Sequence, residues 1–107
     1  MVKQFEITWD YNCIKGSETR FMLYVKHGDQ WKLIKELDSH CDGSEDGYKS
    51  FKELVEHDAP VGKEFILGLS AVNQAGESEK IEYLISIPIP DPESPENFTI
   101  KILNGGD

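Results

Sequence analysis

Apolar and polar residues alternate along most of this chain. In residues 5–10, Phe, Ile and Trp alternate with Glu, Thr and Asp, and the same period of two recurs in residues 21–26, 65–71 and 81–87. A period of two turns one set of side chains toward a core and the other toward solvent, which is typical of a half-buried β-strand. The pattern therefore predicts four strands.

Turn residues separate these stretches. His27-Gly28-Asp29-Gln30 predicts a tight turn, because glycine readily adopts positive φ beside polar neighbours. Trp31, Leu33 and Leu37 then continue as the returning strand, and Ile34 breaks strict alternation, which indicates a bulge. Further polar turns are predicted at residues 57–63, which include a proline and a glycine, and at 73–78.

Residues 48–55 fit two kinds of element. Phe51, Leu54 and Val55 have helical spacing, but the segment is short and has no N-cap followed by a sustained apolar stripe. We expect a strand, because the neighbouring segments are strands that offer sheet partners.

The C-terminal part has a different composition. Four of the five prolines fall between Pro88 and Pro95, which predicts an extended linker over residues 89–96, since proline lacks an amide donor. Beyond it, Phe98, Ile100 and Ile102 alternate with other residues and predict one more strand over 97–104. The expected fold is an all-β antiparallel sandwich over residues 1–88, followed by this linker and strand.

Residues 65–78, Phe-Ile-Leu-Gly-Leu-Ser-Ala-Val-Asn-Gln-Ala-Gly-Glu-Ser, resemble the F strand and F–G turn of a fibronectin type III domain. Residues 5–10 are similar to that family's B strand with its core tryptophan, residues 21–25 to its C strand, and residues 60–65 to the approach to strand F. The resemblance implies an immunoglobulin-like sandwich with strands B to G over residues 1–88.

Two features depart from the family pattern. Phe65 stands where the family usually has a tyrosine bonded back to the E–F turn, so the turn must be held otherwise. The A strand is absent before strand B, yet residues 95–102 read like such a strand displaced to the C-terminus. It can complete its own sheet, pair with a neighbouring molecule, or begin a following domain. This layout resembles small structural proteins of tailed bacteriophages, and type III modules of bacterial secreted proteins look similar.

Charge narrows the expected partners. Eleven basic and twenty acidic residues give a net charge of −9, so nucleic acid and anionic membranes are poor partners, and protein partners are expected. No apolar run approaches the roughly 18 to 20 residues that span a bilayer. Residues 1–10 do not have the pattern of a signal peptide. We expect a location in the virion if the chain is phage-encoded, and an extracellular one otherwise.

Candidate chemistry is sparse. His27, His40 and His57 fall in three separate turns, and neither a nucleophile elbow nor a glycine-rich phosphate loop is present, so we expect no enzyme and no cofactor. Asp38-x-His40-x-Asp42-Gly43 imitates the first half of a calcium loop, but the closing position is Lys49, a cation. A solvated acidic loop is the favoured interpretation.

Cys13 and Cys41 lie in loops that leave the same end of such a sandwich, so their thiols can meet. Two interpretations remain open: a disulfide, or two unrelated small residues that stay reduced in a cytoplasm, the latter being preferred for a chain made there. A fortuitous zinc site with His40 and Asp42 is a weaker alternative.

Two surfaces are candidates for interaction: aromatic side chains on the outer face of the C–C′ sheet, and the loops at the end that holds the cysteines. Lateral packing on the sheet face is the alternative for the aromatics. The candidate residues are Tyr24 and Trp31 on the face, and Asp38, His40, Asp42, Asn73 and Ser78 in the loops. The leading functional hypothesis is a structural or protein-interaction module that exchanges its C-terminal strand. The alternative is a ligand- or carbohydrate-binding accessory module of a secreted multidomain bacterial protein.

Overall fold

The computed structural model of the chain is all-β, and it describes residues 2–59, 62–89 and 91–103. The described residues form no helix, and every strand pair is antiparallel. The strands are β1 (Val2–Cys13), β2 (Arg20–His27), β3 (Gln30–Glu36), β4 (Gly47–Asp58), β5 (Glu64–Asn73), β6 (Gly76–Glu77) and β7 (Ile81–Ser86).

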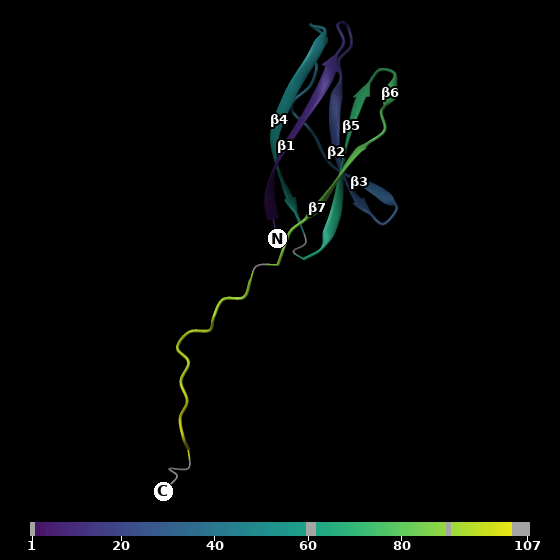
Figure 1. Cartoon of the computed structure of the whole chain (residues 1–107). Helices are drawn as coiled ribbons and strands as arrows, with labels where there is room; N and C mark the ends of the chain where they lie inside the picture. Colours follow the sequence, from purple (N-terminus) through teal and green to yellow (C-terminus); the bar gives the residue numbers. More distant parts are fainter. Residues whose placement is uncertain (1, 60–61, 90, 104–107) are drawn as a thin grey trace.

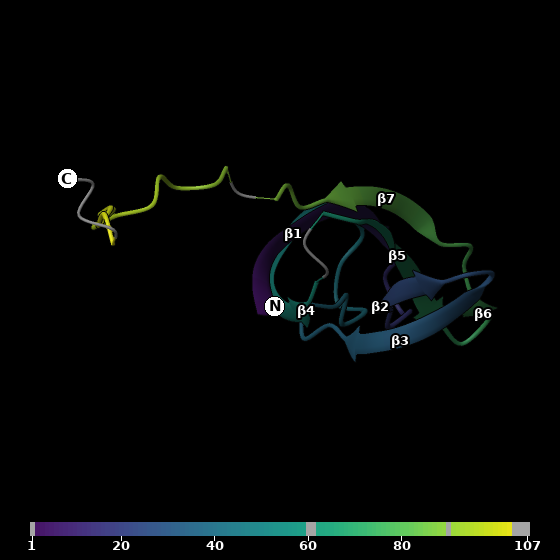
Figure 2. The same cartoon turned by 90° about the horizontal axis from the view of Figure 1, so that it is seen from below.

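The strands form two sheets. β1 and β4 pair along their whole lengths, from Val2 opposite Asp58 to Cys13 opposite Gly47. The second sheet has the order β3-β2-β5, and both β6 and β7 pair with β5. Seen along the strands, β1 and β4 lie on one side and the second sheet on the other (Figures 1 and 2). The prediction of antiparallel β-sheets is confirmed, and the arrangement is consistent with a sandwich.

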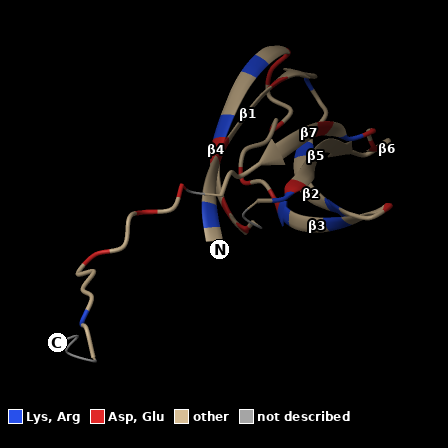
Figure 3. Ribbon diagram, turned by 60° about the horizontal axis from the view of Figure 1, so that its bottom comes forward, with Lys and Arg blue, Asp and Glu red and all other residues tan. Residues whose placement is uncertain are grey.

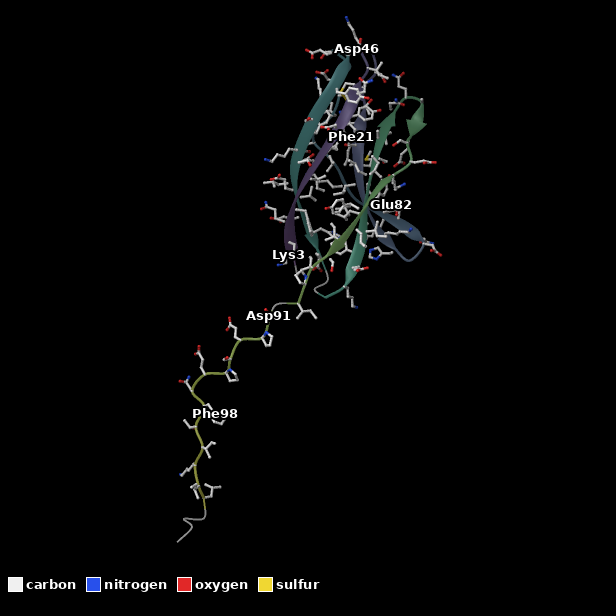
Figure 4. All side chains as sticks on the ribbon, viewed as in Figure 1. Lys3, Phe21, Asp46, Glu82, Asp91 and Phe98 are labelled. Atoms are coloured by element: carbon white, nitrogen blue, oxygen red, sulfur yellow. A yellow bond between two sulfur atoms is a disulfide. The ribbon has the colours of Figure 1, made fainter. Side chains whose placement is uncertain are left out.

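An aromatic cluster joins the two sheets. Phe21 of β2 is 1% exposed, and its ring centroid lies 5.2 Å from that of Trp9 in β1 and 5.3 Å from that of Phe51 in β4. Trp9 and Phe51 are cross-strand partners whose rings stack at 5.3 Å. Phe21 therefore fills the space between the layers (Figure 4).

Several details of the sequence pattern are confirmed. Residues 48–55 lie in a strand, β4, rather than a helix. Gly28 has a φ of 61° in the turn between β2 and β3. Leu23 pairs with Lys35 and Tyr24 with Leu33, so Ile34 is the extra, bulged residue of β3.

The turn before Phe65 is held by backbone rather than by a tyrosine hydroxyl. The amide of Gly62 donates a 2.7 Å hydrogen bond to the carbonyl oxygen of Ile87, just beyond β7. Gly62 has a φ of 78°, which favours glycine there. This bond ties the start of β5 to the place where the chain leaves the sandwich.

The C-terminal segment does not complete the chain's own sheet. Residues 97–103 pair with no strand among the described residues, and Phe98, Ile100 and Ile102 are each 80% exposed. The segment runs away from the sheets (Figure 1), because the proline-rich stretch before it is extended and does not turn back. The expected strand over 97–104 is thus absent from residues 97–103, and residue 104 lies outside the described residues. Pairing with a neighbouring molecule stays a prediction.

Candidate interaction surfaces

A groove separates the two sheets on the side where β1 and β7 face each other. Its volume is about 610 Å³. The buried side chains of Leu23 and Leu67, 2% and 6% exposed, lie at its base. Its walls are residues 5–10 of β1, Gly68 and Leu69 of β5, and Ile81, Tyr83 and Ile85 of β7.

One wall of the groove is an unpaired strand edge. β4 occupies one edge of β1, and no strand in the described part of the chain pairs with the other. In an antiparallel pair, every second residue directs its N–H and C=O away from its partner strand. β1 therefore presents free backbone donors and acceptors along the groove. Beside them, the core-facing side chains of Phe5, Ile7 and Trp9 are only half-buried.

The other wall is apolar. Ile81 and Tyr83 of β7 are 78% and 73% exposed, although both belong to a strand that lines the groove. On the opposite wall, the indole N–H of Trp9 in β1 is buried and has no hydrogen-bond partner among the described residues. Free backbone groups next to exposed apolar side chains are the features that recruit an additional strand.

The predicted aromatic face is present on the second sheet. The rings of Tyr24 and Trp31 meet edge to face with centroids 6.4 Å apart, and the ammonium of Lys80 lies 4.3 Å from the Tyr24 ring. Trp31 also packs over Gly68, where a Cβ atom would come within 2.8 Å of the indole. These contacts are lateral packing on a sheet face. Binding at this face stays a prediction.

A hydrogen-bonded carboxylate anchors the same cluster. The Glu77 Oε2 atom accepts 2.5 Å hydrogen bonds from the hydroxyls of Ser70 and Tyr24. These bonds, that of Ser70 first, hold the pKa of Glu77 below its usual range. The bond to the Glu77 carboxylate, with partial burial, raises the pKa of Tyr24. Glu77 therefore ties β6 to the outer face of β2 and β5.

The loops at one end of the sandwich are joined covalently. Cys13 and Cys41 form a disulfide, with 5.7 Å between their Cα atoms. Next to it, Thr19 and Cys41 exchange two backbone hydrogen bonds of 3.0 Å. The amide of Gly16 donates to the carbonyl oxygen of Gly43 at 2.8 Å. Of the two interpretations left open for the cysteines, the structure has the disulfide and not the preferred pair of unrelated, reduced residues. Cys13 is the last residue of β1 rather than a loop residue, so the bridge ties the start of the loop after β1 to the loop that contains Cys41.

The carboxylates of the acidic loop do not converge to form a calcium site, because Asp38 and Asp42 have separate partners. Asp38 forms an ion pair with Lys35 at 3.6 Å, and its amide donates to Glu53 in the middle of β4. Asp42 instead accepts hydrogen bonds from Ser44, whose hydroxyl lowers the pKa of Asp42. Within residues 2–59, 62–89 and 91–103, no group of three or more histidine, cysteine or acidic side chains is placed to hold a metal ion.

The remaining candidate loop residues form hydrogen bonds with residues that are near them in the sequence. The Asn73 side-chain oxygen accepts from the Ala75 amide, and the Ser78 hydroxyl accepts from the Ala71 amide. Both residues line a second hollow of about 240 Å³ beside Tyr11. His40 Nδ1 lies 3.1 Å from the carbonyl oxygen of Asp38.

His57 packs against Phe65, with 6.2 Å between ring centroids, and burial lowers the pKa of His57. His27 lies at the turn between β2 and β3. No histidine forms a hydrogen-bonded pair with a serine or cysteine side chain among the bonds of the described residues.

Sequence reasoning found one wall of the groove and missed the other. The strand pattern displaced to residues 95–102 predicts a missing neighbour beside residues 5–10, and β1 has a free edge among the described residues. The alternation of Ile81, Tyr83 and Ile85 predicts core-facing side chains, whereas Ile81 and Tyr83 are exposed along the groove.

The described residues contain no helix with the length and apolarity to cross a bilayer. Comparison of the chain with protein-family models, with curated proteins and with solved structures finds no match.

Proposed function

We propose that this chain is a fibronectin type III-like structural module without enzymatic activity, and that it binds protein partners by accepting a β-strand at the free edge of β1. The strand order supports the fold part of this proposal. β1, β2, β3, β4, β5 and β7 follow in the order of the family's B, C, C′, E, F and G strands, with β1 and β4 in one sheet and the others in the second.

The observation that carries the functional part is the groove. It combines a free backbone edge on β1 with apolar side chains on both walls. A strand that enters such a groove gains main-chain hydrogen bonds from the edge, while its alternate side chains enter the apolar floor. A small polar ligand would meet few directed polar side chains there, so an extended polypeptide is the occupant that fits best.

The setting that we propose is a bacteriophage virion. The proposal rests on the layout of the described chain, a sandwich whose β1 has a free edge and which is followed by a proline-rich extension; this layout resembles small phage structural proteins. The neighbouring genes test it: genes for virion components on both sides agree with it, whereas genes for hydrolases or surface anchors contradict it.

Peptide binding tests strand acceptance directly. We expect fluorescently labelled peptides of eight residues, with alternating apolar and polar side chains, to bind the full chain and saturate in an anisotropy titration. The Tyr83→Asp variant places a carboxylate on the groove wall and should abolish binding. Tyr48→Asp is the matched control, because Tyr48 is similarly exposed, 80% against 73%, and does not line the groove. If no alternating peptide binds, or if both variants bind equally, strand acceptance is refuted.

One observation favours a second candidate. The Cys13–Cys41 disulfide is typical of proteins that fold in oxidising compartments, which agrees with a ligand- or carbohydrate-binding accessory module of a secreted protein. Its binding surface would be the bridged loops together with residues 73–78. Saturable binding of an oligosaccharide that is lost when Asn73 and Ser78 are replaced by alanine would support this candidate over the first.

A further inference from the structure

The segment 97–103 has the side chains of a buried strand and no strand partner among the described residues. Phe98, Ile100 and Ile102 alternate along it, and each is 80% exposed, while Leu103 is 84% exposed. Figure 4 shows Phe98 far from the sheets. Such a series of apolar side chains normally lies against a core, because exposed apolar surface is unfavourable in water.

The spacing of this segment matches the groove. In antiparallel strands, residues two apart are separated by roughly 6.8 Å. Three alternating side chains of one strand can therefore lie opposite three alternating side chains of the neighbouring strand. On β1 the three are Phe5, Ile7 and Trp9. A strand that enters antiparallel to β1 with Ile100 beside Ile7 brings Phe98 next to Trp9 and Ile102 next to Phe5.

Charge also matches. Lys101 is the single charged residue of the segment 97–103, so the remainder of the chain carries ten basic and twenty acidic residues. The groove wall on β1 includes Glu6 and Asp10. Figure 3 shows acidic positions in the linker and a basic one nearer the C-terminal end. The segment is therefore the part of the extension that a negatively charged sandwich repels least.

The chain's own groove is hard for this segment to reach. To run antiparallel to β1, it must enter at the far end of the groove, so the linker must reverse direction directly after β7. Four prolines lie between residues 88 and 95, and such a sequence favours a stiff, extended conformation. The Gly62–Ile87 hydrogen bond fixes the point where the chain leaves. The segment consequently projects away from its own sandwich (Figure 1).

We propose that residues 97–103 of one copy occupy the groove between β1 and β7 of a second copy, pairing antiparallel with β1. The inference rests on the proposed function, because it names the strand that the groove accepts. The occupant is a second copy of this chain, and the mode of association is the donation of a strand.

The experiment measures self-association of the full chain by sedimentation equilibrium over a range of concentrations. We expect dimers or longer assemblies. The donor variant Phe98→Asp with Ile100→Asp should weaken association by more than about tenfold, because it would bury unpaired carboxylates. Both residues are exposed, so folding should be unaffected. Thr99→Lys is the matched control and should not weaken association, since it adds a charge to the same segment on the side that faces away from the groove floor, near Glu6 and Asp10.

Mixing the donor variant with the Tyr83→Asp variant distinguishes strand donation from nonspecific association. The donor variant keeps an intact groove, and Tyr83→Asp keeps an intact C-terminal segment. Neither should associate alone, but the mixture should form a one-to-one complex, because it restores one pair of donor and groove. Loss of association in both variants without recovery on mixing overturns the proposal.

The result for peptides separates this inference from the proposed function. A full chain that stays monomeric at millimolar concentration while alternating peptides still bind its groove overturns the second copy as the occupant and leaves strand acceptance standing. A monomeric chain whose groove binds no peptide overturns both. Association that persists unchanged in the donor variant also overturns the inference, since the contact then lies elsewhere.

Discussion

Removal of the Cys13–Cys41 disulfide should lower the free energy of unfolding by about 3.6 kcal/mol, from the loop-closure entropy of a loop with a sequence separation of 28. Small domains are stable by only about 5–15 kcal/mol, so this is a large share of the total. The sulfurs are buried, with the two cysteines 2% and 1% exposed, and reduction leaves their packing volume nearly unchanged. The loss therefore comes mainly from the freedom that the unfolded chain regains.

Urea unfolding with and without a phosphine reductant measures this loss. With an m-value of about 1–3 kcal/mol/M, the midpoint should fall by roughly 1.2–3.6 M. The double variant Cys13→Ala, Cys41→Ala should unfold near the reduced midpoint, and reductant should not shift it further. A thiol titration of the denatured, unreduced chain should find no free thiol. If the midpoints with and without reductant agree within experimental error, the bridge contributes no stability and the reasoning fails.

Three further outcomes are expected. Phe21→Ala should cost about 3–5 kcal/mol in urea unfolding, because a fully buried ring is lost between the sheets; a cost under 1 kcal/mol would contradict that packing. Gly68→Ala should displace the Trp31 indole, shift its fluorescence and cost about 1–3 kcal/mol; an unchanged emission maximum would show that the indole does not lie over Gly68. The lowered pKa of Glu77 stabilises the fold above the group's ordinary value of 4.5, and this contribution is lost as the pH falls through the folded-state pKa. Glu77→Gln should thus reduce the fall in stability between pH 7 and pH 3, whereas Glu79→Gln should not, and equal slopes in both variants would refute the assignment.

The strands could be predicted from the sequence wherever alternating residues are buried on one face of a sheet. Phe21, Leu23 and Val25 are at most 3% exposed, as their alternation required. Residues 48–55 were ambiguous because Phe51, Leu54 and Val55 have helical spacing, whereas in β4 only Phe51 and Val55 face the core and Leu54 is exposed. Their conformation is decided by a twelve-residue pairing with β1, which is a long-range contact that local spacing does not encode.

The sites were less predictable, because they depend on contacts between distant segments. Whether Cys13 meets Cys41 depends on the backbone bonds between Thr19 and Cys41, which no spacing along the chain specifies. The C-terminal segment shows the reverse case. Phe98, Ile100 and Ile102 have a strand pattern, yet a strand needs a hydrogen-bonded neighbour, and the single chain supplies none to the described residues of that segment.

The place where the chain leaves the sandwich affects what else the molecule can contact. The exit beside Gly62 lies at the end of the sandwich opposite the loop that contains Asp46 (Figures 1 and 4). A donated strand with Phe98 beside Trp9 enters the acceptor copy from the end that holds Cys13, so the donor's linker would pass beside the acceptor's bridged loops. Substitutions in those loops could therefore change the strength of the joint between copies as well as the recognition of a target.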